Sequence, residues 1–378
     1  MSGRDPSSFG VYIHVPFCAT RCGYCDFNTY TAGELGSSTP KAWHEALRTE
    51  LSIAATATGG VPVDTVFVGG GTPSLLGGRG LAAVLGAIRD NFTLARDAEV
   101  TTEANPESTS AAFFEEIWAA GYTRVSLGMQ SASTRVLGLL DRVHSPGRPV
   151  EAAREARAAG FEHVNLDLIY GTPGESDDDL AASLDAVLAA GVDHVSAYAL
   201  IVEEGTGRPR RVRRGEVARP DGDVIAERCE MVDARLSAAG LSWYEVSNWS
   251  LPGAECRHNL GYWNGGQWWG AGPGAHSFVG DTRWWNVKHP ATYSDMLKRG
   301  ESPIADSERL TEHDRHVEAV MLGIRLRSGL DLATLNSSER TRASRAVADG
   351  LLEFRSDRAV LTDRGRLLAD AVVRDLLD

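Results

Sequence analysis

The sequence predicts an α/β protein built on a partial (β/α)6 TIM-like barrel, followed by a mostly helical, winged-helix-like C-terminal domain. Six short β-branched runs alternate with helix-length segments through the first 200 residues, a pattern that predicts parallel strands joined by right-handed crossovers. Six strands are fewer than the eight that close a full barrel, so the barrel is expected to stay open on one side. A flat doubly wound sheet fits the same alternation and is the second possibility.

The period of the apolar residues sets the expected elements. The six strands are expected at residues 11–15, 64–68, 99–103, 124–128, 163–169 and 194–200. The helices between and after them are expected at residues 41–57, 80–91, 110–120, 149–159, 177–190 and 223–239. A glycine follows four of these helices closely, as it does where helices end.

Changes in composition and in the pattern of apolar residues divide the chain into three predicted parts. Residues 1–240 carry the barrel pattern, and residues 241–300 form a segment rich in tryptophan and glycine that holds seven of the nine tryptophans. Residues 301–378 are expected to form the winged-helix-like domain, with helices at 312–326 and 338–349 followed by two short strands and a last helix.

Composition excludes several classes of protein. The formal net charge of −13 argues against a nucleic-acid partner, which favours a basic face. No apolar run is long enough to span a bilayer, so no membrane span is expected. The first residues lack the apolar stretch of an export signal, and we therefore expect a cytoplasmic protein.

Three cysteines crowd into eight residues directly after the first predicted strand. They are Cys18, Cys22 and Cys25, in the spacing C-x3-C-x2-C. Three thiolates are one short of a closed zinc site, unless His14 completes it from within the strand. They suit a 4Fe-4S cluster with one iron left open to a small molecule. The alternative is a zinc site or a plain thiol loop.

Polar residues and glycines also follow the ends of later strands. The second strand runs into three glycines and Thr72, and the third ends at Glu103. Each feature alone is weak, because a glycine triplet also makes tight turns and a single polar residue is usually a surface group or a cap. Their shared position predicts a pocket, since a barrel gathers side chains at the carboxyl ends of its strands.

The cysteine spacing and this series of segments resemble the radical S-adenosylmethionine (SAM) superfamily. The resemblance implies a 4Fe-4S cluster on the three cysteines, which reduces the SAM sulfonium and releases a 5′-deoxyadenosyl radical. It further implies SAM contacts from Tyr12, Gly70 and Glu103. Positions that contact a second SAM in one branch of the family correspond to Tyr24, Gly71, Thr72, Gln130, Arg142 and Asp167.

Almost the whole chain resembles the branch that contains the oxygen-independent coproporphyrinogen III oxidases and the HemW-type heme chaperones. The oxidases carry a further cysteine where this chain has Phe27, so oxidase activity is doubtful and whether the chain is an enzyme stays open. The H-N-x-x-Y-W motif, formed by His258, Asn259, Tyr262 and Trp263, resembles the heme-associated signature of the chaperones. The resemblance implies a protein that binds heme and transfers it to an acceptor protein, such as a membrane respiratory enzyme. The alternative is the oxidase itself.

The motif also suits heme on chemical grounds. Histidine is a common axial ligand to heme iron, aromatic rings supply apolar surface, and Arg257 offers a partner for a propionate. The neighbouring Cys256 offers a thiolate, and His276 is a second candidate histidine. The opposing interpretation is that His258 is a structural histidine and that the tryptophans belong to the core.

Overall fold

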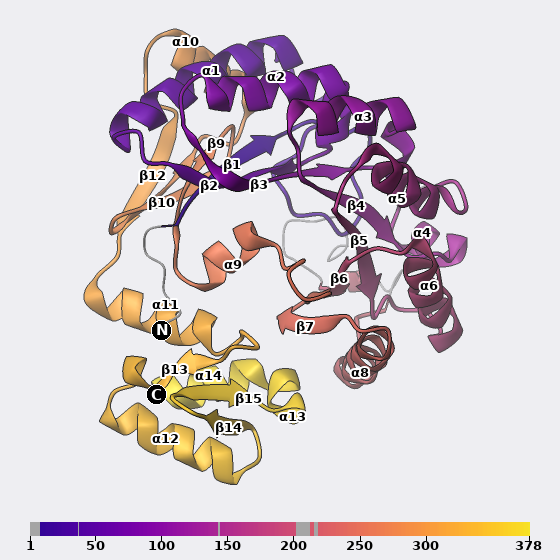
Figure 1. Ribbon diagram of the computed structural model, residues 1–378, viewed down its shortest axis with the longest axis vertical. Coiled ribbons are helices and arrows are strands. Elements are labelled where there is room, and N and C mark those ends of the chain that lie inside the picture. The colour runs from indigo at the N-terminus through magenta and orange to yellow at the C-terminus, as the bar shows by residue number, and fades with distance from the viewer. Residues whose placement is uncertain (1–7, 37, 143, 202–211, 215–217) are drawn as a thin grey trace.

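Figure 1 shows the computed structural model, which describes residues 8–36, 38–142, 144–201, 212–214 and 218–378. Its main feature is a twelve-stranded sheet with the strand order β12-β11-β10-β9-β1-β2-β3-β4-β5-β6-β8-β7. A separate three-stranded sheet, β13-β15-β14, lies near the C-terminus.

Six parallel strands form the centre of the large sheet in chain order, as predicted. They are β1 (Phe9–Val15), β2 (Val63–Gly70), β3 (Leu94–Ala104), β4 (Arg124–Gln130), β5 (His163–Tyr170) and β6 (His194–Ala199). The helices that join them cover the outer face of the curved sheet (Figure 1): α1 (Pro40–Ala57), α2 (Gly77–Arg89), α3 (Ala111–Ala120), α5 (Arg148–Ala159) and α6 (Asp177–Ala190). Because these helices lie on one face of a curved sheet, the fold is the partial barrel rather than the doubly wound sheet.

Helix ends follow the expected capping chemistry. Ser176 and Asp179 form a capping box at the start of α6, and Gly121, Gly160 and Gly191 adopt left-handed backbone angles directly after α3, α5 and α6. The sequence prediction missed the short helix α4 (Thr134–Leu139), along with the 3₁₀ turns Pro73–Leu76 and Pro106–Ser108.

The tryptophan-rich segment, together with residues 304–309 of the predicted C-terminal part, extends both edges of the sheet, which the sequence did not predict. Strand β9 (Gln267–Ala271) pairs in parallel with β1, and β10 (His276–Val279), β11 (Thr282–Asn286) and β12 (Ile304–Arg309) continue outward in antiparallel order. At the other edge, β8 (Asn248–Ser250) and β7 (Ser242–Glu245) lie antiparallel to β6 and to each other. Residues 241–300 therefore share one sheet with the barrel.

Three helices of the same half of the chain complete this unit. α8 (Gly222–Ala238) packs beside α6, and α10 (Pro290–Lys298) packs on α1. The short helix α9 (Arg257–Trp263) lies inside the arc of strands, where it contacts β1 and β2 (Figure 1). This helix carries the H-N-x-x-Y-W motif, so the motif faces the interior of the barrel.

The C-terminal part has a small hydrophobic core of its own, which includes Val320, Ile324, Leu352 and Leu376. Its elements are α11 (Glu312–Gly323), β13 (Leu330–Asp331), α12 (Ser337–Ala348), β14 (Leu352–Arg355), β15 (Arg358–Leu361), α13 (Asp363–Leu367) and α14 (Ala369–Leu377). This order confirms a mostly helical C-terminal domain with a small antiparallel sheet. The three-part division of the chain stays a prediction.

None of the helices in the described ranges combines the length and the apolar character needed to cross a bilayer.

Candidate functional site

A cavity of about 790 Å³ occupies the interior of the partial barrel. Its lining includes Cys18, Cys22 and Cys25 in the loop after β1, and it extends to Cys256 and Asn259 at the start of α9. The volume lies within the usual range of small-molecule sites, roughly 300–1,000 Å³. The barrel therefore offers one continuous space between the two sequence motifs.

The three clustered cysteines are half-buried free thiols on the wall of this cavity. The Cys18 thiol lies 3.6 Å from the hydroxyl of Thr72, and Arg142 donates from Nη1 to the Cys22 sulfur at 3.7 Å. Burial raises the pKa of the Cys25 thiol to about 11. Within the described ranges, no three His, Cys, Asp or Glu side chains are grouped to hold a single metal ion.

Two carboxyl groups, those of Glu103 and Asp167, line the same cavity, and neither forms an ion pair with another of the described residues. Burial, followed by the charge of Asp167, raises the pKa of Glu103 to about 8. Burial likewise raises the pKa of Asp167 to about 6, although Asn165 and Ser126 donate hydrogen bonds to it. Buried carboxyl groups with raised pKa values gain most from a cation placed beside them. This part of the cavity is therefore built to receive positive charge.

Packing explains the two glycines at the end of β2, Gly70 in the strand and Gly71 directly after it. Gly70 has φ of +106°, and a Cβ there would lie 2.5 Å from the His14 ring. A Cβ on Gly71 would lie 2.5 Å from the carbonyl oxygen of Phe17. The absence of side chains lets the end of β2 close against the cysteine loop, while Gly70 still donates its N–H to Glu103 at 3.0 Å.

Gln130 is positioned at the cavity by its backbone conformation, and Arg142 by the hydrogen bonds of its side chain. Gln130 ends β4 at a register shift against β5 and has φ of +68°, a strained value for a residue other than glycine. Arg142 is fixed by its bonds to the Gly128 carbonyl oxygen at 2.9 Å and to His144 Nε2 at 2.6 Å. Its guanidinium therefore stands beside the thiol loop in one orientation.

Most residues predicted to bind SAM line this cavity. They are Tyr24, Gly70, Gly71, Thr72, Glu103, Gln130, Arg142 and Asp167. Tyr12 is the exception, because it does not belong to the lining; its hydroxyl lies 3.1 Å from His14 Nδ1 and its ring packs against Phe67.

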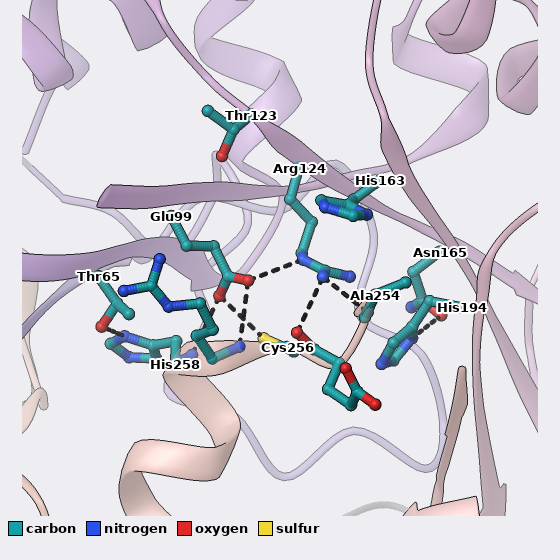
Figure 2. A network of polar contacts seen from close by, with 12 residues as sticks. Thr65, Glu99, Thr123, Arg124, His163, Asn165, His194, Ala254, Cys256 and His258 are labelled. Carbon is teal, nitrogen blue, oxygen red and sulfur yellow. Dashed lines mark hydrogen bonds and ion pairs between the residues drawn. The ribbon is translucent and has the colours of Figure 1, made fainter. Parts of the chain in front are cut away.

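At the α9 end of the cavity, Glu99 and Arg124 form a buried ion pair, with Arg124 Nε 3.1 Å from Glu99 Oε2 (Figure 2). Glu99 also accepts the backbone N–H groups of Arg257 and His258 at 3.1 and 3.0 Å. Arg124 donates from Nη2 to the Ala254 carbonyl at 2.7 Å. This network anchors the start of α9 to the barrel.

This ion pair was not predicted from the sequence. The signal was two opposite charges inside the predicted third and fourth strands, which become neighbours because Thr101 pairs with Arg124. Arg124 lines the cavity and its Nη1 has no hydrogen-bond partner among the described residues.

His258 is a structural histidine in this arrangement. It is 3% exposed, Nδ1 lies 2.8 Å from the Thr65 hydroxyl, and Nε2 lies 2.8 Å from the Tyr262 hydroxyl (Thr65 and His258 appear in Figure 2). Its ring stacks on Phe67, and burial lowers the pKa of His258 to about 4. Both ring nitrogens are engaged, so ligation of heme by His258 would require one of these hydrogen bonds to break, and the assignment stays a prediction.

The neighbours of His258 are also engaged. Tyr262 bonds His258 and packs edge-on against Trp268, with ring centroids 4.6 Å apart. Arg257 donates to the Asp97 carbonyl oxygen at 2.6 Å rather than pointing free for a propionate. Trp263 is half-buried outside the lining, and Asn259 alone of the four motif residues lines the cavity.

Comparison with known proteins agrees with this geometry. Residues 12–187 match the radical SAM superfamily, and residues 310–368 match the HemN C-terminal domain. The chain is 67% identical to the heme chaperone HemW of Mycobacterium tuberculosis, over 98% of this chain and 95% of that protein. It is 32% identical to the heme chaperone HemW of Bacillus subtilis, over 96% of this chain and 97% of that one.

Among solved structures, the coproporphyrinogen III oxidase HemN of Escherichia coli superposes with a TM-score of 0.83. That match covers 98% of this chain and 90% of the oxidase at 21% identity, so it shows a shared fold. The sequence matches go further, since they extend over nearly the full length of the chaperones. The chain belongs to the HemW family of the radical SAM superfamily.

Proposed function

We propose that this chain is a heme chaperone, which binds heme and passes it to an acceptor protein, and that its barrel carries a 4Fe-4S cluster with exchangeable SAM. The observation that carries the proposal is the 67% identity to a protein named heme chaperone over 98% of the chain. We further propose that the protein works in the cytoplasm and that its acceptor is a separate protein, such as a membrane respiratory enzyme.

The donor set of the cysteine loop fits the cluster. Cys18, Cys22 and Cys25 are free thiols on one wall of the cavity, and three thiolates would leave one iron open. When bound, such a cluster supplies an electron to SAM and an open coordination site for its amino and carboxylate groups. Arg142, fixed beside Cys22, would offset the negative charge of the thiolates.

The middle of the cavity fits the cation of SAM. Glu103 and Asp167 have raised pKa values, and each would become a better partner for positive charge once a sulfonium or ammonium group displaces water beside it. Gly70, Gly71 and Thr72 would bring the β2 end within contact of the same ligand. Gln130 and Arg142 would complete the far wall, whereas Tyr12 would act through Phe67 and His14 rather than by contact.

The oxidase is the weaker candidate. Its support is a likeness of fold at 21% identity, which carries no reaction with it. Phe27 stands at the mouth of the cavity, 57% exposed, where the oxidase resemblance calls for a further cysteine. The one position named here that differs thus lies in the lining of the site.

Anaerobic reconstitution followed by two assays tests the proposal. Titration of the reconstituted protein with hemin is expected to give a saturable Soret shift at one heme per chain, and the loaded protein is expected to lose heme to an apo-acceptor. Incubation with SAM, a reductant and coproporphyrinogen III is expected to give no protoporphyrinogen. Hemin binding no stronger than to an unrelated protein, or formation of protoporphyrinogen, would contradict the proposal.

A further inference from the structure

The heme ligand of a chaperone needs a ring nitrogen that is free and reachable, because the cargo must leave again. Among the described residues, both ring nitrogens of His14, His194 and His258 are hydrogen-bonded. His144, His163, His289 and His316 each have one ring nitrogen in a hydrogen bond. Within the described residues, the histidines with no ring nitrogen in a hydrogen bond are His44, His276 and His313, and these three are the most readily available ligands.

Of these three, His276 alone stands on an exposed aromatic face. Its ring stacks on Trp285 with centroids 5.5 Å apart and 24° between the planes. The ring of His44 contacts Trp43, but that indole is 1% exposed and cannot cover a ligand. His313 is exposed at the start of α11, and no aromatic contact accompanies it in the described part of the chain.

The strand register explains why aromatic side chains gather around His276. On β10 and β11, His276 pairs with Trp285 and Phe278 pairs with Arg283, and Phe278 also pairs with Trp268 on β9. Residues two apart on a strand, and residues directly opposite on paired strands, share one face of a sheet. That face therefore presents His276 between half-buried indoles, which supply the apolar surface that a porphyrin needs.

Positive charge lies next to this face. Burial, followed by the charges of Arg283 and Lys288, lowers the pKa of His276, and the neutral imidazole is the form that coordinates a metal. Arg283 is already paired with Glu308 and Glu318, at 2.9 and 2.7 Å. Lys288 is exposed and has no ion pair among the described residues, so it remains available to a propionate.

Resting on the proposed function, we propose that His276 is the axial ligand to heme on the β9–β11 face, with Lys288 as the partner of a propionate. The H-N-x-x-Y-W motif then positions this face indirectly, through a series of side-chain contacts. Tyr262, held by His258, packs on Trp268, and Trp268 donates its indole N–H to the His276 carbonyl oxygen at 2.8 Å. Loss of a motif side chain would act on heme through the position of β9 and β10.

Hemin titration of the full-length reconstituted protein and four variants tests the assignment. His276→Ala is expected to weaken hemin binding by about tenfold or more and to abolish the low-spin Soret band, because it removes one coordinate bond. Added imidazole is expected to restore that band in His276→Ala, which a merely structural role would not allow. Lys288→Ala is expected to weaken binding by about threefold, with the band unchanged.

His313→Ala is the matched control, since it removes another exposed histidine and should bind hemin as the unchanged protein does. His258→Gln is the competing assignment, and it should keep the band if its cluster content shows that it has folded. If hemin binds and His276→Ala retains the band and affinity, the ligand assignment is wrong while the chaperone function stands. Loss of the band in folded His258→Gln alone would also overturn it. If the unchanged protein binds no hemin, the proposed function itself fails.

Discussion

The two ends of the barrel cavity both carry a sequence motif, yet the structure treats them differently. At the cysteine loop the three thiols are half-buried and not joined in disulfides, and they line the same cavity as two carboxyl groups whose pKa values are raised. At α9 the motif residue His258 is hydrogen-bonded through both ring nitrogens, to Thr65 and to the motif residue Tyr262. A sequence motif therefore does not by itself distinguish residues that bind a ligand from residues that hold the fold together. The contacts of each side chain in the structure are needed to separate the two.

The largest effect is expected for the cysteine loop. Replacing Cys18, Cys22 or Cys25 with alanine should remove nearly all bound iron and sulfide after anaerobic reconstitution, because no other free thiol lines that wall of the cavity among the described residues. Iron and sulfide analysis with the visible absorbance band measures this. Cys229→Ser is the control and should keep the full cluster; its loss there would mean that the ligands are misassigned.

At the start of α9, substitutions are expected to lower the free energy of unfolding instead. Arg124→Met leaves the Glu99 carboxylate buried with its backbone donors but without its cation, which typically costs about 3–5 kcal/mol of the free energy of unfolding. Urea unfolding measures the loss. Arg299→Met breaks an exposed pair with Glu301 and should leave the free energy of unfolding almost unchanged. Equal effects of the two substitutions would mean that the α9 anchor is not a special feature.

The pH dependence of SAM affinity tests the role of the Glu103 carboxyl group. Its pKa of about 8 means that the carboxyl is mostly protonated at neutral pH, so the affinity for SAM should rise between about pH 6.5 and about pH 8.5. Glu103→Gln should lower the affinity about tenfold and flatten this dependence, as measured by equilibrium dialysis.

Stability should change in the opposite direction. Because the folded pKa of Glu103 is raised above its unfolded value of about 4.3, the ligand-free fold loses stability as pH rises from about 4.3 to about 8. Glu103→Gln removes that loss and should raise the Tm of the ligand-free protein at neutral pH. A lower Tm, or SAM affinity that falls with rising pH, would show that Glu103 does not face the cation.

The smallest effect is expected for Arg257→Ala. The side chain is 43% exposed and pairs with an even more exposed Asp97, so its loss should change the free energy of unfolding by less than about 1 kcal/mol. Hemin affinity should stay within about twofold. A strong loss of hemin affinity would support the prediction that Arg257 holds a propionate and would contradict the assignment of the heme face to β9–β11.

The sequence predicted the parts of the molecule that depend on local pattern. The six parallel strands and their helices follow from apolar period and capping, and the cysteine loop follows from spacing at a strand end. The edge strands β9–β12 were missed because they are short, follow one another without helices between most of them, and in β9 and β11 are rich in tryptophan. The Glu99–Arg124 pair was missed because its register depends on tertiary pairing, and the state of His258 depends on Thr65, nearly 200 residues away.

The central claim is that cluster and heme occupy separate regions of one chain. Reconstituting the protein and its Cys18→Ala/Cys22→Ala/Cys25→Ala variant in parallel, then counting iron, sulfide and heme per chain, tests it most directly. The account predicts that the variant loses the cluster and still binds one heme with an affinity within about threefold of the unchanged protein. Loss of heme together with the cluster, in a variant whose circular dichroism shows an intact fold, would contradict it.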